Sequence, residues 1–183
     1  MPSDPSCQIS QFTALSFLVR GVPLHTLYAE TTPLLITFSA QRFAKARDWL
    51  QTGLLASERP AAPGDHPFPI QLAGFLTGAA SEARLQSSPF LRMGTALQQE
   101  VWKLLLAIPR GETRSYGELA RALGNQGYAR AVGQACKANP LALLIPCHRV
   151  VAGAGLGGYA GGQDLKGFLL ALERKREGGG RLA

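Results

Sequence analysis

A thiol and an imidazole, the side chains of Cys147 and His148, are neighbours in this sequence. A thiol attacks as its thiolate, and an ordinary pKa of about 8.5 leaves only a few per cent of a cysteine ionised near neutrality. A neighbouring base therefore assists such an attack. The aliphatic residues on either side favour an extended segment, in which adjacent side chains point to opposite faces. The imidazole would then reach the sulfur only through a bridging water or a bend at Pro146.

By itself the pair does not establish catalysis. A neighbouring cysteine and histidine are more often an inert buried thiol and a half-buried structural histidine than a nucleophile and its base. The elements that would position the two side chains therefore have to decide between these interpretations.

Two capping boxes predict helices on the N-terminal side of the pair. Thr95 with Gln98 opens one helix, and Ser115 with Glu118 opens another over residues 116–123. In this motif the first side chain accepts from the backbone N–H of the second residue, whose side chain accepts from the first in return. A glycine turn then leads to a third helix, and two short helices joined in this way indicate a helix-turn-helix.

The third helix, expected over residues 128–138, has two distinct faces. Its small-residue face contains Ala129, Val132, Gly133 and Cys136, and its polar face contains Arg130, Gln134 and Lys137. The polar face is equally well a solvated charged stripe or a surface that binds a polyanion. Because Cys136 lies on the packed face, we expect it to be a core residue rather than a nucleophile.

A last helix is expected over residues 165–176, with Asp164 as its cap. Glu173 follows Leu169 by four residues and therefore lies beside the apolar face. A carboxylate in this place can reach back and orient a histidine. The alternative is a surface ion pair with Arg176, one turn further on.

The first half of the chain predicts a small sheet with helices. Strands are expected over residues 12–20, 24–30 and 33–39, helices over 40–53 and 70–78, a loop over 54–69 and a linker over 79–89. We therefore expect an α+β fold with two domains. Residues 1–88 would form an N-terminal supporting domain, and residues 89–183 a mostly helical domain with the helix-turn-helix and Cys147.

Cysteine and histidine usage argues against a metal site. The soft ligands of the first half are Cys7, His25 and His66, which lack the close spacing of a zinc site and number three where a structural site takes four. With three cysteines in 183 residues there is no disulfide framework, which fits a reducing cytoplasm.

Charge is distributed unevenly along the chain. Residues 1–88 carry six Lys/Arg and six Asp/Glu, whereas residues 89–183 carry thirteen and six, so the net charge of +7 belongs to the half with Cys147. Such an excess favours a polyanionic partner, nucleic acid before membrane. No apolar run approaches the roughly 20 residues that span a bilayer. No basic segment precedes residues 12–19, as it would in a secretory signal.

Several ordered motifs of the second half resemble one family. They are Ile108-Pro109-x-Gly111-x-Thr113-x-Ser115-Tyr116-Gly117, Ala129-Arg130-Ala131-Val132-Gly133, Asn139-Pro140, Ile145-Pro146-Cys147-His148-Arg149-Val150, Gly158-Tyr159-x-Gly161-Gly162 and Lys166. Over about residues 93–176 the chain closely resembles the O6-alkylguanine-DNA alkyltransferases, also called methylated-DNA-protein-cysteine methyltransferases. The first half resembles them only in the layout of its strands and helices.

The resemblance implies repair of double-stranded DNA that carries O6-alkylguanine, with the damaged base flipped out of the stack and its alkyl group transferred irreversibly to Cys147. His148 would act as a base through a water, Glu173 would orient it, and Asn139 would brace the turn beneath the sulfur. The residues expected to contact the base or the DNA are Arg114, Tyr116, Ala129, Arg130, Gly133, Lys137, Val150, Tyr159 and Ala160. Transfer would need no cofactor, and we expect a monomer.

Three other functions fit parts of the sequence. An alkyltransferase-like protein would bind damaged DNA without transfer, but such proteins usually replace the acceptor cysteine, which is present here. A helix-turn-helix regulator would use Arg130 and Lys137 at an operator, yet it has no use for a Pro-Cys-His-Arg segment. A cysteine hydrolase would need an oxyanion hole, for which the sequence offers no candidate.

Overall fold

The computed structural model describes residues 9–29, 32–53, 56–59 and 89–174. Its main sheet has four strands in the order β3-β2-β1-β4. Strands β1 (Gln11–Val19), β2 (Val22–Ala29) and β3 (Thr32–Thr37) pair antiparallel in that succession. The three predicted strands are therefore confirmed.

The fourth strand, β4 (Ser57–Arg59), pairs in parallel with β1. It corrects the prediction of a continuous loop over residues 54–69. Its three polar residues show no apolar alternation, so pairing with β1 alone makes them a strand. The predicted helix over residues 70–78, and with it the expected domain boundary at residue 88, lie outside the described residues.

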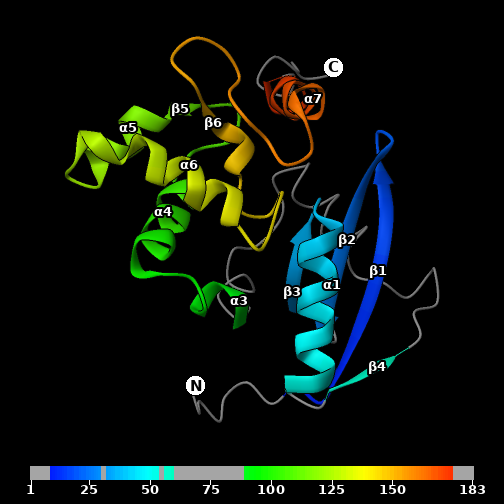
Figure 1. Cartoon of the computed structure of the whole chain (residues 1–183). Coiled ribbons are helices and arrows are strands. Elements are labelled where there is room, and N and C mark those ends of the chain that lie inside the picture. The colour runs from blue at the N-terminus through cyan, green and yellow to red at the C-terminus, as the bar shows by residue number, and fades with distance from the viewer. Residues whose placement is uncertain (1–8, 30–31, 54–55, 60–88, 175–183) are drawn as a thin grey trace, which may run out of the picture.

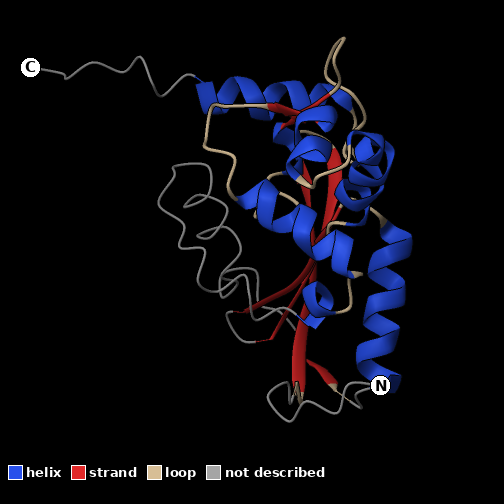
Figure 2. Ribbon diagram, turned by 90° about the vertical axis from the view of Figure 1, so that its left-hand side faces the viewer, coloured by secondary structure: helices blue, strands red, loops and turns tan. Residues whose placement is uncertain are grey.

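Helix α1 (Ala40–Asp48) covers one face of this sheet (Figure 1, Figure 2). The Ser39 hydroxyl caps it by accepting from the Arg42 N–H. The chain continues as a π-helical turn, η1 (Trp49–Gly53), which confirms the predicted helix over residues 40–53. Sheet and helix enclose a core of their own, made of Phe12, Leu27, Leu34, Leu35, Ala46, Leu50 and Ala56.

The second half is mainly helical, as predicted (Figure 1). Its helices are α3 (Pro89–Arg92), α4 (Ala96–Leu106), α5 (Tyr116–Ala122), α6 (Ala129–Ala138) and α7 (Gln163–Arg174). Both capping boxes are present with their reciprocal bonds, at Thr95 and at Ser115. Helices α5 and α6 pack together across a short 3-10 turn and form the predicted helix-turn-helix.

Helix α7 begins at Gln163, so Asp164 lies in its first turn and does not cap it, contrary to the prediction. Gly162, with φ of 88°, turns the chain directly into the helix at this point. The carboxylate of Asp164 still lies near the positive end of the helix dipole. The predicted helix end at residue 176 lies outside the described residues. Within the described ranges, no helix is long and apolar enough to cross a bilayer.

The two halves of the chain are joined through β3. The Ile36 N–H donates to Pro140 O at 2.7 Å, and the Ala142 N–H donates to Ile36 O at 2.8 Å, so this segment runs beside β3 in parallel. One buried cluster spans both halves and includes Leu24, Tyr28, Ile36, Val101, Leu105, Val132, Cys147 and Leu169. The N-terminal sheet therefore supports the segment that leads to Cys147.

Candidate active site

Cys147 begins a one-turn 3-10 helix, η4 (Cys147–Arg149), and does not lie in an extended strand. Pro146 turns the chain with φ −80° and ψ 60°, and its carbonyl accepts from the Arg149 N–H at 2.9 Å. The expectation of an extended segment is wrong, and the alternative of a bend at Pro146 agrees with the structure. An extended strand would point the side chains of His148 and Arg149 to opposite faces. In the turn, both reach the same carboxylate.

The sulfur of Cys147 is held by Asn139. Only 8% of the cysteine is exposed. The Asn139 amide donates to Sγ at 3.3 Å and to Ile145 O at 2.8 Å, while its Oδ1 accepts from the Leu141 N–H at 2.9 Å. Burial raises the pKa of the Cys147 thiol, and the amide and the Lys166 ammonium act in the opposite direction. The site therefore keeps a protonated thiol at rest but offers hydrogen bonding and positive charge to a thiolate.

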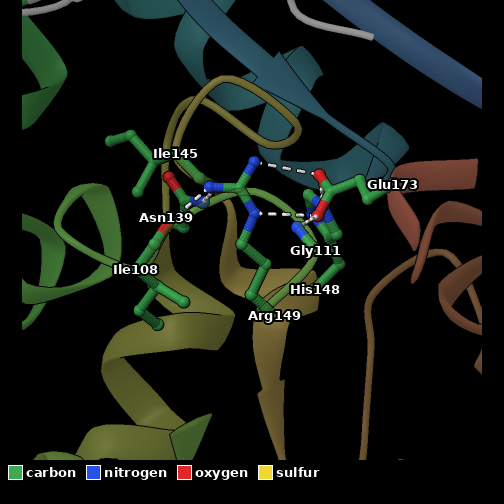
Figure 3. Close-up of polar contacts among 7 residues, drawn as sticks. All are labelled: Ile108, Gly111, Asn139, Ile145, His148, Arg149 and Glu173. Atoms are coloured by element: carbon green, nitrogen blue, oxygen red, sulfur yellow. Dashed lines mark hydrogen bonds and ion pairs between the residues drawn. The ribbon is translucent and has the colours of Figure 1, made fainter. Parts of the chain in front are cut away.

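His148 and Glu173 form a buried pair, with Nε2 2.9 Å from Oε1 (Figure 3). Burial acts to raise the pKa of Glu173, but hydrogen bonds from His148 and Arg149 outweigh it and lower the pKa to about 2. Burial lowers the pKa of His148, although its bond to Glu173 opposes this shift. Because an ionised carboxylate only accepts, Nε2 carries the proton and Nδ1 the lone pair of a neutral imidazole.

Arg149 is the third member of this cluster, and the sequence predicted no role for it. Its Nε donates to Glu173 Oε2 at 2.9 Å and its Nη2 to Oε1 at 3.0 Å, while Nη1 donates to Ile108 O at 2.6 Å (Figure 3). The Gly111 N–H also donates to the carboxylate, at 3.3 Å. Since Glu173 is 3% exposed, the alternative of a surface ion pair is wrong. A signal was present, because a glutamate beside an apolar face needs a charged partner.

Lys166 is a second charged side chain without an assigned role in the sequence analysis. It is fully buried, and its Nζ donates to Val150 O at 2.5 Å, Leu156 O at 2.6 Å and Gly158 O at 3.2 Å. The ammonium thus ties the glycine-rich loop over residues 153–162 to β6 (Val150–Val151), the short strand that follows Cys147. Its spacing of three residues from Leu169 placed it on the apolar face of the helix, which was a usable signal.

Two tyrosines predicted to contact the base lie at the glycine-rich loop, Tyr159 within it and Tyr116 against Gly158. Tyr116 begins α5 and is half-buried, and its hydroxyl donates to Gly158 O at 3.4 Å. Burial raises the pKa of Tyr116. The ring of Tyr159 lies edge-on to that of His148 at 6.4 Å and to that of Phe38 at 5.7 Å. An aromatic residue from the N-terminal half therefore reaches the site.

The other predicted contact residues lie mostly nearer the surface. Arg114, Arg130, Lys137 and Ala160 are exposed, Ala129 and Gly133 are half-buried, and Val150 is fully buried. Arg114 pairs with Glu112 at 2.9 Å. At Gly133 a Cβ atom would lie 3.8 Å from the ring of Tyr116, so α6 approaches α5 closely. The structure thus gathers the predicted catalytic side chains and leaves the charged residues that were predicted to contact DNA exposed.

Two further expectations concern cysteine and histidine. Cys136 is half-buried against the core, and burial raises its pKa, which agrees with the prediction of a core residue. His25 hydrogen-bonds to Ser16 at 2.7 Å and stacks on Phe43 at 5.0 Å. In the part of the chain that the structure describes, no three His, Cys, Asp or Glu side chains gather as metal ligands.

Sequence comparison finds methylated-DNA-protein-cysteine methyltransferases among the relatives of this chain. Residues 96–175 match the family described as 6-O-methylguanine DNA methyltransferase, DNA binding domain. A methylated-DNA-protein-cysteine methyltransferase of Mycobacterium tuberculosis is 50% identical over 107 residues, which are 58% of this chain and 63% of that protein. That of Mycolicibacterium paratuberculosis is 45% identical over 126 residues, 68% of this chain and 72% of that protein. By sequence, the chain spans less than two thirds of the M. tuberculosis relative.

Solved structures extend the likeness to the N-terminal half. The crystal structure of the M. tuberculosis O6-methylguanine methyltransferase matches with a TM-score of 0.65 at 32% identity, over 90% of this chain and 94% of that one. A crystal structure of M. tuberculosis OGT in complex with DNA matches with a TM-score of 0.63 at 32% identity, over 91% of this chain and 94% of that one.

Proposed function

The chain belongs to the methylated-DNA-protein-cysteine methyltransferase family, and from this premise we propose that it repairs DNA by transferring the alkyl group of O6-alkylguanine to Cys147. The surroundings of the sulfur carry the proposal. Asn139 donates to Sγ of Cys147. His148, the residue after Cys147, is a neutral histidine held by the buried carboxylate of Glu173. A displacement at carbon needs these parts, a nucleophile and a base that accepts its proton.

Atoms and electrons balance without a cofactor. The Cys147 thiolate attacks the alkyl carbon, an S–C bond forms as the C–O6 bond breaks, and the electron pair of the broken bond stays on the guanine oxygen. The proton that the thiol loses ends on the guanine. The protein product is a thioether with a poor leaving group, so each chain would repair one lesion.

His148 is the proposed base and acts through a water. The lone pair on Nδ1 accepts the proton, and the ionised Glu173 stabilises the imidazolium that forms. Arg149 holds both carboxylate oxygens in parallel, which fixes Glu173 in one orientation. Glu173 and Arg149 thus hold the His148 imidazole in one orientation, and burial keeps the pKa of His148 low.

The flipped base is proposed to lie between the two tyrosines. Among the described residues, the buried hydroxyl of Tyr159 has no hydrogen-bond partner. Such a group costs about 1–3 kcal/mol, which a polar base edge would offset. Tyr116 would crowd the flipped nucleotide from the opposite side, the carbonyl of Val150 would accept from the guanine amino group, and the backbone at Ala160 would cover the base.

DNA is proposed to bind along α5 and α6. Arg130 is exposed in the first turn of α6 and would fill the space that the flipped base leaves. Lys137 and Arg114 would contact phosphates, which gives affinity with little dependence on sequence. The small residues Ala129 and Gly133 would allow the backbone to come close. We propose a monomer acting in the cytoplasm, on double-stranded DNA with O6-alkylguanine as the substrate.

Intact-protein mass after mixing with a duplex that contains one O6-methylguanine tests the proposal. The expected gain is one CH2 unit, saturating at one per chain and mapping to Cys147 by peptide analysis. Cys147→Ala should bind alkylated DNA and gain nothing, whereas Cys136→Ala should gain mass like the wild type. An unchanged wild-type mass with tight binding would replace the proposal with a damage-binding protein.

A further inference from the structure

Arg42 connects the N-terminal half to the end of helix α6. Its side chain leaves α1 and donates to three consecutive carbonyl groups. Nη1 donates to Lys137 O and to Asn139 O, both at 3.1 Å, and Nη2 donates to Ala138 O at 2.8 Å. These partners are 95 to 97 residues away in the sequence. No local pattern in α1 distinguishes this arginine from its neighbours.

The three carbonyls need donors because they end a helix. The last carbonyls of a helix have no partner within it, and the helix dipole favours a cation there. A guanidinium presents five N–H donors in a fixed planar fork and can serve three acceptors at once. A lysine ammonium on its flexible stem would keep the charge but lose the fork. Arg42 therefore fits this helix end in shape as well as in charge.

Asn139 links this contact to the sulfur. Its carbonyl accepts from Arg42, while its side-chain amide donates to Cys147 Sγ at 3.3 Å. The next residue, Pro140, accepts from the Ile36 N–H of β3 at 2.7 Å. The turn that carries the amide is therefore held from two sides by the N-terminal half.

We propose that Arg42 is a positioning residue for the acceptor cysteine. By fixing the end of α6, it holds the Asn139 amide on the sulfur. The helix proposed to bind DNA and the nucleophile therefore keep a fixed position relative to each other. Arg42 acts through Asn139, because the hydrogen bonds described above go to the carbonyls at the end of α6 and not to the sulfur. Its role rests on the proposed function and gives the N-terminal half a part in transfer beyond support of the fold.

The pH dependence of Cys147 alkylation reports on this role. Burial raises the pKa of the thiol, whereas the Asn139 hydrogen bond, the Lys166 charge and the Arg42 charge lower it. Loss of Arg42 loosens the amide and removes a charge, and both changes raise the thiol pKa. The other titratable or charged groups around the thiol are unchanged in such a variant, and they are Tyr116, Cys136, His148, Arg149, Tyr159, Lys166 and Glu173.

Three variants separate positioning from folding. Arg42→Met removes the fork and the charge, and Arg42→Lys keeps only the charge. Lys45→Met is the matched control, because Lys45 is an exposed cation one turn later on the same helix. Each protein is treated with iodoacetamide between about pH 6 and 10, which spans the ordinary range of thiol ionisation. Peptide mass spectrometry gives the rate at Cys147, and thermal melting shows the temperature below which every variant is folded.

We expect the midpoint of the Arg42→Met profile to rise by about half a pH unit or more, which leaves about threefold less thiolate at a given pH. Arg42→Lys should lie between this variant and the wild type, and Lys45→Met on the wild-type curve. Methyl transfer from a duplex should slow about tenfold in Arg42→Met. If Arg42→Met does not fold, the profile of Arg42→Lys decides.

The positioning role would be overturned if both Arg42 variants showed the wild-type pH dependence of Cys147 alkylation and differed only in a lower melting temperature. Arg42 would then have a purely structural role. Failure of the proposed function looks different. In that case the wild type itself transfers no methyl group from DNA, while the iodoacetamide profiles still decide whether Arg42 positions the thiol.

Discussion

The amide nitrogen of Asn139 lies 3.3 Å from the sulfur of Cys147 and donates a hydrogen bond to it. A hydrogen bond to an ionised acceptor is about twice as strong as one to a neutral acceptor. The contact therefore favours the thiolate over the thiol and counteracts the effect of burial on the thiol pKa. We therefore propose that this asparagine, eight residues before the cysteine, takes part in activating it.

Asn139→Ala should slow methyl transfer by about tenfold or more. A hydrogen bond to a charged group is worth about 1.5–3 kcal/mol, and about 1.4 kcal/mol corresponds to tenfold in rate. Single-turnover transfer from a duplex substrate measures the effect. Asn125→Ala is the control, because Asn125 caps an exposed turn through the Gly127 N–H and should transfer like the wild type. Equal rates for both variants would show that the sulfur does not need the amide.

Glu173→Gln should destabilise the protein by about 3 kcal/mol or more, because it removes one member of a buried ion pair and leaves Arg149 without its counter-ion. Urea unfolding gives the free energy. Glu100→Gln offers a matched comparison, since Glu100 pairs with Lys103 on the surface and such pairs contribute about 0–1 kcal/mol. Similar losses in the two variants would contradict a special role for the Glu173 cluster.

Acid should destabilise the folded protein through the same cluster. The pKa of Glu173 is lowered from 4.5 to about 2 in the folded protein. Its contribution to the free energy of unfolding is therefore complete above the unfolded-state pKa and is lost as the pH falls through the folded-state pKa. The loss amounts to about 3 kcal/mol. His148, whose pKa is also lowered, takes up its proton on unfolding and adds to the decline below about pH 6.5. Urea unfolding between about pH 7 and 2 should show this fall in the free energy of unfolding. Glu173→Gln should lack the part of the fall that lies at the lowest pH, where Glu173 takes up its proton.

Arg130→Ala should slow transfer from duplex DNA much more than transfer from the free O6-methylguanine base. The side chain is exposed, lies outside the catalytic cluster and is proposed to act only on the duplex. Mass spectrometry of Cys147 with each substrate gives both rates. As the control, Lys45→Ala removes an exposed charge from helix α1, outside the proposed DNA-binding surface, and should leave both rates unchanged. Equal slowing on both substrates would contradict the role in base flipping.

Much of the fold was predictable because its signals are local. The capping boxes at Thr95 and Ser115 join residues three apart, and both are present as predicted. Short motifs around Cys147 also indicated the family. The segment at Cys147 was predicted as extended, because its aliphatic neighbours favour a strand. It forms a turn instead, in which His148 and Arg149 both bond the carboxylate of the distant Glu173. Strand β4 was missed for a related reason, since it exists only through its partner β1.

The sequence by itself determined most of the elements of this protein and its family, and it predicted Cys147 and His148 as nucleophile and base. Tertiary structure alone decided which charges surround them. Arg149 meets Glu173 across 24 residues, and Arg42 meets the end of α6 across more than 90. A buried charge has to find a partner, but its identity depends on which distant segments meet when the halves pack. The spacing of residues along the sequence does not show which segments these are. The folded structure shows it, because there the two halves are in contact.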